Sequence, residues 1–108
     1  MSPTAIRDVR FFTARSALSR PIADATHAIP EIRFVVAGIA LANGVTGQSH
    51  LLAFHYSRHA IAGACRDLEA FLRGRDACDT EAVIRAWDAE SEYFGQAGVN
   101  RWALGLAN

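Results

Sequence analysis

The sequence predicts an α+β fold, in which a three-stranded antiparallel β-meander is followed by a bundle of about three helices. In the first half of the chain, apolar and polar residues alternate, and Asn43-Gly44 separates two of the alternating segments. In the second half, apolar residues recur at three- and four-residue steps. The 108 residues suffice for one domain, and a content of 51% hydrophobic and 20% charged residues is typical of a globular chain.

The alternating segments set the expected strands and turn. Asn43-Gly44 is a dipeptide that tolerates positive φ, so a two-residue hairpin turn is expected there. A stretch with two prolines and no sustained period is expected to form a loop of about ten residues, long enough to suggest a function. The strands are expected at residues 6–14, 31–42 and 46–54, and the loop at residues 21–30.

Three helices are expected in the second half. Ser57 is placed to cap the first and Gly74 to end it, while Asp79 or Thr80 is placed to cap the second. Gly95 and Gly98 then break the chain before the third helix. The expected apolar stripes are Ile61, Ala64, Leu68, Phe71 and Leu72 in the first helix, Ile84, Trp87, Ser91 and Phe94 in the second, and Val99, Trp102, Ala103 and Leu106 in the third.

The charges exclude several classes of function. All eleven cationic side chains are arginines, and they balance eleven carboxylates. A neutral chain has no net attraction for nucleic acid or an anionic membrane, and without lysine it has no lysine base or Schiff base. The first residues are interrupted by charges, unlike a signal peptide, and no apolar run is long enough to span a membrane. A cytoplasmic protein with reduced Cys65 and Cys78 is therefore expected.

No catalytic or metal-binding group can be assembled from the residue spacing. His55 and His59 are four residues apart, but the expected cap at Ser57 divides them between a loop and a helix. No further histidine, cysteine or carboxylate completes a tetrahedral set, so no metal site is predicted. His50, within a strand, is expected to be a partly buried structural residue.

Two irregular segments are better candidates for a functional role than these residues. They are the loop at residues 21–30 and the strand exit Phe54-His55-Tyr56. In an antiparallel meander, the loop after the first strand and the end of the third strand lie at the same edge. Together they present aromatic, imidazole and apolar groups suited to one wall of a pocket.

The order of these motifs resembles the N-terminal capping domain of the enolase superfamily, of the mandelate racemase/muconate lactonizing enzyme type. The resemblance is strongest to talarate/galactarate (acid-sugar) dehydratases and covers nearly all of the chain. The residues that carry it are Pro21-Ile22-Ala23-Asp24-Ala25, Asn43-Gly44, the run from Thr46-Gly47 through Ser49, Leu51 and Ala53 to Phe54, then Tyr56-Ser57, Trp87-Asp88, Tyr93-Phe94-Gly95, Gly98 and Trp102-Ala103.

The resemblance implies that residues 1–108 form a capping domain and that the catalytic (β/α) barrel is absent from this chain. The complete enzyme would be a racemase (an isomerase) or a dehydratase (a lyase) that removes the proton α to a substrate carboxylate. The barrel would supply the bases and the ligands of Mg²⁺, which stabilises the developing enediolate. This chain would be inactive alone, with no catalytic residue and no cofactor of its own.

The capping domain of that family closes over the barrel, excludes water and selects the substrate. Mandelate racemases tend to carry tyrosine where this chain has Phe54, and apolar residues in the loop where it has Asp24, Thr26 and His27. These departures favour a hydroxylated carboxylate such as an acid sugar. The resemblance assigns the lid to Pro21, Ile22, Thr26, His27, Phe54, His55 and Tyr56, and these seven are called the lid residues below.

A second hypothesis needs no barrel. The chain would then be a free-standing α+β protein-interaction module that associates with itself through its apolar edge. Both hypotheses predict an exposed apolar surface larger than that of an ordinary monomer, and a homo-oligomer. They differ in whether the reading frame continues past Asn108 into β/α repeats.

Overall fold

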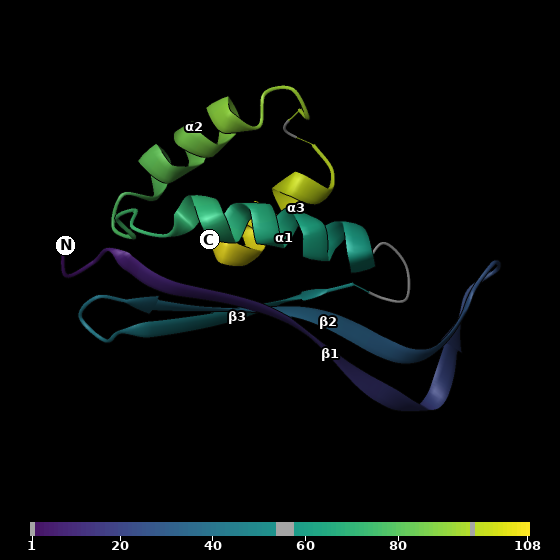
Figure 1. Ribbon diagram of the computed structural model, residues 1–108. Coiled ribbons are helices and arrows are strands. Elements are labelled where there is room, and N and C mark those ends of the chain that lie inside the picture. The colour runs from purple at the N-terminus through teal and green to yellow at the C-terminus, as the bar shows by residue number, and fades with distance from the viewer. Residues whose placement is uncertain (1, 54–57, 96) are drawn as a thin grey trace.

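The computed structural model describes residues 2–53, 58–95 and 97–108, and confirms the α+β fold (Figure 1). In the view of Figure 1, a three-stranded antiparallel sheet lies below the helices, and all three helices lie on one side of the sheet. The elements are β1 (Ile6–Ala23), β2 (Ala28–Leu41), β3 (Thr46–Leu52), α1 (Arg58–Leu72), α2 (Thr80–Glu90) and α3 (Val99–Ala107).

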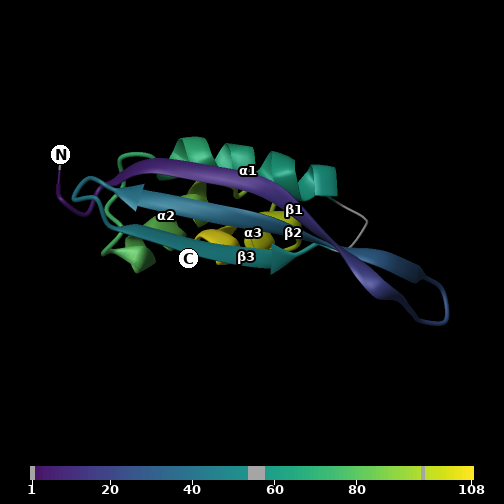
Figure 2. The same ribbon diagram turned by 90° about the horizontal axis from the view of Figure 1, so that it is seen from below.

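The strands follow one another in the order β1-β2-β3, as expected for a meander. Side chains alternate between two faces, because successive residues of a strand point to opposite sides. Val9, Val35 and Ala37 are buried on the face that the helices cover. The opposite face carries the aligned residues Phe12, Val36 and His50, and no described element lies over it (Figure 2).

Helix α1 supplies the centre of the core. Ile61, Cys65 and Leu68 recur at four- and three-residue steps and are fully buried against the sheet. Gly74 follows the helix at φ +84°, which confirms its expected role in ending α1. Its N–H donates to the carbonyl of Ile6 over 2.8 Å, so the helix end is fixed to the start of β1.

Helix α2 is capped as expected but is shorter than its predicted stripe. The Asp79 carboxylate accepts from the N–H of Ala82 over 3.1 Å. The helix ends at Glu90, where the hydroxyl and N–H of Ser91 both donate back to the carbonyl of Trp87, over 2.7 and 2.9 Å. Phe94 therefore lies beyond the helix and is 83% exposed, so its predicted place in the apolar stripe is wrong.

Helix α3 lies over β2 and β3, with Ala103, Leu104 and Leu106 buried. The hydroxyl of Ser49 donates to the carbonyl of Leu106, which joins the helix to β3. Trp102 was expected in the buried stripe but is 51% exposed. A short helix rotates its buried face to suit the adjacent core, and here that face is made by residues 103, 104 and 106.

Residues 42–45 separate β2 from β3, and three of them, 42–44, form the turn inside the hydrogen-bonded pair Leu41 and Val45, where the sequence predicted a two-residue turn. The N–H of Leu41 donates to the carbonyl of Val45, and the N–H of Gly44 donates to the carbonyl of Leu41. Gly44 adopts φ +90°, so the expected positive φ is present. The extra residue converts the two-residue turn into a turn followed by a glycine bulge.

The predicted loop at residues 21–30 is wrong in its extent. β1 continues to Ala23 and β2 begins at Ala28, so only residues 24–27 form a turn. The two strands pair at Ala17↔Glu31 and again at Ile22↔Ile29, with the register interrupted between these pairs. Residues 18–30, called the arm below, thus form a β-ribbon that projects past the helices (Figure 1).

Among the described residues, no helix has both the length and the apolar character needed to cross a membrane. Both cysteines are free thiols. Burial raises the pKa of the Cys65 thiol to about 11, so this group is a neutral core residue at physiological pH.

Candidate functional site

The arm carries four of the seven lid residues. Pro21 and Ile22 lie on β1, Thr26 lies in the turn, and His27 immediately precedes β2. All four are exposed, and Ile22 shows 53% of its surface. Figure 2 shows the arm extending beyond the end of the sheet that the helices cover. These side chains are therefore available to a ligand or to a second domain.

Asp24 organises the turn at the tip of the arm. Its Oδ1 accepts from the N–H groups of Thr26 and His27, over 2.8 and 2.6 Å. The N–H of Asp24 in turn donates to the carbonyl of His27 over 2.9 Å. This is the arrangement by which an aspartate side chain replaces a backbone turn partner. The turn holds Thr26 and His27 side by side, with 2.7 Å between Thr26 Oγ1 and His27 Nδ1.

The stability of the turn at the tip is expected to depend on pH, because the Asp24 carboxylate accepts two of its hydrogen bonds. The N–H of Thr26, followed by that of His27, lowers the pKa of the carboxyl below its ordinary value of 3.8. Because the folded pKa is the lower one, this stabilisation is complete above the ordinary pKa and is lost as pH falls through the folded pKa. In Asp24→Ala, the amide protons of Thr26 and His27 should exchange faster at neutral pH.

Asp24→Asn is the matched control for this prediction. Its side-chain oxygen still accepts both N–H groups but does not titrate, so protection should persist and should not change on acidification. NMR-detected hydrogen exchange across an acid titration measures both variants. Unchanged exchange in Asp24→Ala would show that the tip does not rely on this carboxylate.

The base of the arm is held by an ion-pair cluster. Arg15 and Arg33 are cross-strand partners, an arrangement that like charges make unfavourable. Glu31 compensates for it: its Oε1 lies 2.6 Å from one terminal nitrogen of Arg33 and accepts from Arg33 Nε over 2.7 Å. Its Oε2 lies 4.0 Å from Arg15. This cluster was missed in the sequence because its members lie on two strands whose pairing was not foreseen there.

The third strand ends beside this base. Leu52 pairs with Phe34, and the N–H of Ala53 donates to the carbonyl of Arg33 over 2.8 Å. The chain therefore leaves β3 at the end of the sheet from which the arm projects. The remaining lid residues, Phe54, His55 and Tyr56, follow at once but lie outside the described residues.

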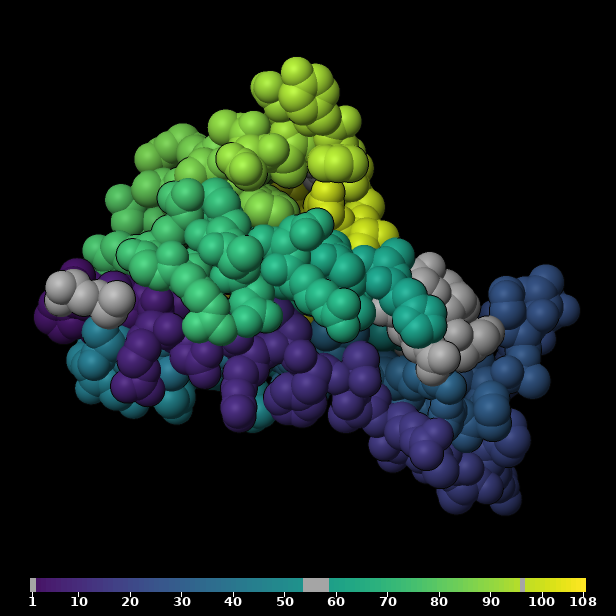
Figure 3. Space-filling view, in the orientation of Figure 1, coloured from purple at the N-terminus to yellow at the C-terminus, as the bar shows by residue number. Residues whose placement is uncertain are grey.

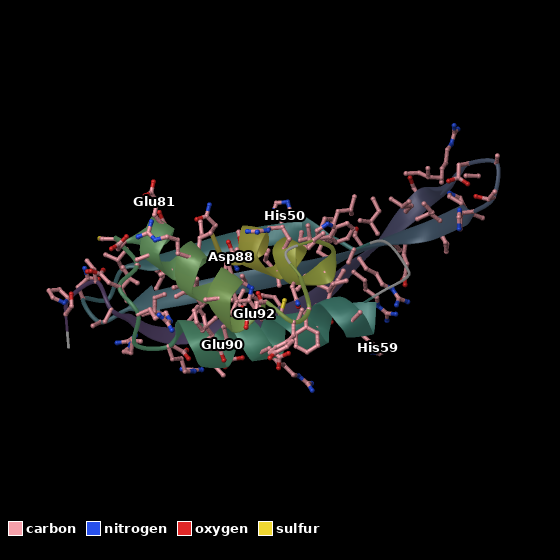
Figure 4. All side chains as sticks on the ribbon, turned by 90° about the horizontal axis from the view of Figure 1, so that it is seen from above. His50, His59, Glu81, Asp88, Glu90 and Glu92 are labelled. Atoms are coloured by element: carbon pink, nitrogen blue, oxygen red, sulfur yellow. The ribbon has the colours of Figure 1, made fainter. Side chains whose placement is uncertain are left out.

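The other histidines and carboxylates do not converge. Figure 4 labels His50 on β3, His59 on α1, and the acidic residues of α2 and of the segment after it. His50 is exposed, contrary to the expected partial burial, with its ring 5.7 Å from that of Phe34. Within the described ranges, no three His, Cys, Asp or Glu side chains gather as a metal-binding group. These residues therefore do not fit Mg²⁺.

An apolar pocket of about 270 Å³ opens elsewhere, between the sheet and helices α2 and α3. The described residues of its walls include no histidine, cysteine or acidic side chain, so they offer shape and apolar contact. None of the four described lid residues lines it. The lining residues are Ile6, Ile39, Leu41, Val45, Thr46, Gly47, Leu72, Ala77, Thr80, Val83, Ile84, Leu104, Ala107 and Asn108.

No protein-family model and no curated protein matches this chain. Among solved structures, a racemase from Streptomyces coelicolor with bound magnesium superposes with a TM-score of 0.85 at 24% identity, over 94% of this chain and 29% of that one. An L-talarate dehydratase from Polaromonas, complexed with Mg and L-glucarate, gives 0.82 at 22% identity, over 92% and 28%.

A third match is an enolase from Bradyrhizobium complexed with magnesium and mandelic acid. It gives a TM-score of 0.77 at 26% identity, over 95% of this chain and 28% of that chain. The chain thus spans less than a third of the length of the proteins that it matches. The predicted resemblance is confirmed: the chain has the fold of mandelate racemase/enolase-superfamily proteins, talarate/galactarate dehydratases included, over a share of their length consistent with an N-terminal domain.

Proposed function

We propose that this chain is the N-terminal capping domain of a Mg²⁺-dependent mandelate racemase-like enzyme. The enzyme would be a racemase or an acid-sugar dehydratase that removes the proton α to a carboxylate. The chain itself is the lid of that enzyme and is inactive alone. Its partners are a (β/α) barrel domain that supplies the reactive groups and a small carboxylate substrate.

One observation carries this proposal. The arm places Pro21, Ile22, Thr26 and His27 past the end of the helix-covered sheet, and β3 ends at the base of that arm. A surface built to close over another domain has this shape, because its contact residues stand clear of its own core. The solved structures that share the fold support the proposal, since they bear the names of racemases and dehydratases.

The chemistry of the arm favours a hydroxylated substrate. Thr26 and His27 present a hydroxyl and an imidazole, held together by the turn at Asp24. Ile22 adds an exposed apolar surface that would exclude water from the closed site. Mg²⁺ would stabilise the negative charge of an enediolate when bound. The described residues of this chain contribute binding, orientation and water exclusion.

The test is a screen of acid sugars and aryl hydroxy-acids with Mg²⁺. It compares this chain alone with the longest reading frame that contains it. We expect turnover only in the longer protein, and we expect Thr26→Ala with His27→Ala to raise its KM for a hydroxylated substrate. Turnover by the short chain alone would contradict the proposal.

A self-associating interaction module remains the second candidate. The observation that favours it is the amount of apolar surface outside the core. Tyr93 and Phe94 are 94% and 83% exposed, and Phe12 and Trp102 are each about half exposed. Surfaces of this kind mark protein contacts in soluble domains. If the reading frame does not extend beyond this chain, the hypothesis of a self-associating interaction module is favoured.

A further inference from the structure

The outer edge of β3 carries a row of unpaired backbone groups. The N–H of Leu41 donates to the carbonyl of Val45, and the N–H of Ala53 donates to the carbonyl of Arg33. The backbone N–H and C=O groups of odd-numbered residues in this strand therefore point toward β2. Because the hydrogen-bonding direction alternates along an antiparallel strand, the N–H and C=O of Thr46, Gln48, His50 and Leu52 point away from β2. In the described part of the chain, no backbone hydrogen bond reaches these groups.

The edge of β1 is protected in a way that the edge of β3 is not. The Arg73 guanidinium donates to the carbonyls of Arg7 and Val9 over 3.3 and 3.4 Å. The N–H of Ile6 donates to the carbonyl of Arg75 over 2.8 Å. Farther along, β1 carries the charged residues Arg10 and Arg15 and then an interrupted register. Charges, bulges and covering groups are the devices that keep edge strands from pairing.

Among the described residues, none of these devices protects β3. Its sequence, Thr-Gly-Gln-Ser-His-Leu-Leu, contains no proline and no arginine, lysine or carboxylate. It pairs with β2 from Thr46 to Leu52 without a shift in register. An uncharged, regular edge suits a second strand, and its alternating donors and acceptors complement an antiparallel copy of themselves.

We propose that β3 pairs with β3 of a second copy across a twofold axis, giving a continuous six-stranded sheet. A register centred on Ser49 overlaps all seven residues of the strand. It places Gln48 opposite His50 of the copy and Thr46 opposite Leu52 of the copy. In this register, each of the four residues whose backbone groups point outward lies opposite another such residue of the copy. The N–H and the C=O of each one then form hydrogen bonds across the axis.

The side chains on the helix side fit the same register. Leu51 of the copy would lie beside Gly47, because the register pairs residues whose numbers add to twice that of Ser49. A Cβ built on Gly47 meets nothing within 4 Å. A hollow of about 190 Å³, lined in part by Gly47, Ser49 and Leu106, opens at this place. The absent side chain of Gly47 thus leaves room for the half-buried Leu51 of the second copy.

The inference deepens the self-association expected of this chain and does not depend on its role as a lid. Two double variants test the register. Gln48→Lys with His50→Lys opposes like charges twice across the axis, and should raise the dimer dissociation constant about tenfold. Gln48→Lys with His50→Glu opposes unlike charges, and should keep the constant within about threefold of the original or lower it.

Both variants change two exposed side chains and lose the same histidine, so they are matched. Sedimentation equilibrium over a dilution series gives the constants, and circular dichroism verifies folding. A chain that is monomeric at every concentration, or equal dissociation constants for the two variants, would overturn the proposal.

Hydrogen exchange gives an independent test. On concentration, the amide protons of Gln48 and His50 should become protected, while those of Gly47, Ser49 and Leu51 are protected throughout; unchanged exchange at Gln48 and His50 would also overturn it.

Discussion

Replacing Ile61 by alanine is expected to lower the free energy of unfolding by about 3–4 kcal/mol. Ile61 lies in the first turns of α1 and has no exposed surface. It belongs to the cluster that joins the helices to Val9 and Val35 of the sheet. Removing its side chain leaves a cavity in a close-packed interior, and a domain of this size has only about 5–15 kcal/mol of total stability.

The matched control is Ile22→Ala, the same substitution in the arm. Ile22 is 53% exposed and has no place in the core cluster, so its loss should cost well under 1 kcal/mol. Urea unfolding followed by circular dichroism measures both changes. Equal destabilisation of the two variants would mean that the arm is packed as tightly as the core. The control also separates roles: under the proposed function, Ile22→Ala should weaken substrate binding by the longer protein without affecting folding.

The core of the fold was predictable because each of its elements carries a local signal. Alternation defined the paired parts of the strands, and Asn43-Gly44 marked their turn. Gly74 and Asp79 ended and began helices where expected, since positive φ and N-terminal capping are properties of single residues. The missing information concerned pairing between distant residues, which a local pattern does not contain.

The arm shows this limit most clearly. A two-stranded ribbon with no core beneath it has no reason to alternate apolar and polar residues, so residues 21–30 showed no sustained period. Pro21 and Pro30 suggested a loop because proline cannot donate to a ladder. Both prolines lie where the register of β1 and β2 is interrupted, and so they are tolerated. The strands could continue past the body of the sheet because β1 and β2 were already aligned there.

The sequence proposed residues for the candidate site but did not predict the shape of the segment that carries four of them. The lid residues of the arm were identified through motif order, and the structure places them together on one projection. The Asp24 turn and the Glu31 ion pairs that hold them there emerge only once β1 and β2 are paired. Side chains that bind a ligand must be exposed and must also be held in place. A stretch of polar residues without periodicity indicates exposure, but it does not show which contacts will hold the side chains.

Replacing Trp87 by alanine is expected to cost about 3–5 kcal/mol, with the loss concentrated in α2. Among the described residues of α2, Trp87 alone is buried. Its ring lies 4.9 Å from that of Phe71 on α1, at an interplanar angle of 59°. This aromatic pair joins α2 to α1, and Figure 1 shows α2 farther from the sheet than α1. Without it, α2 should open while the sheet and α1 persist.

Trp102→Ala controls for the loss of a tryptophan, because Trp102 is 51% exposed and should contribute less than about 1 kcal/mol. Hydrogen exchange resolved by residue distinguishes local from global opening. In Trp87→Ala, the amides of Thr80–Glu90 should lose protection while those of Ile61 and Leu68 keep theirs. Uniform loss of protection would show instead that α2 is part of a single cooperative core. Retained protection in α2 would show that contacts such as Val83 and Ile84 hold the helix without the aromatic pair. Local opening is the expected result because the core is centred on α1 and the sheet, while Trp87 is the buried side chain that α2 contributes to it.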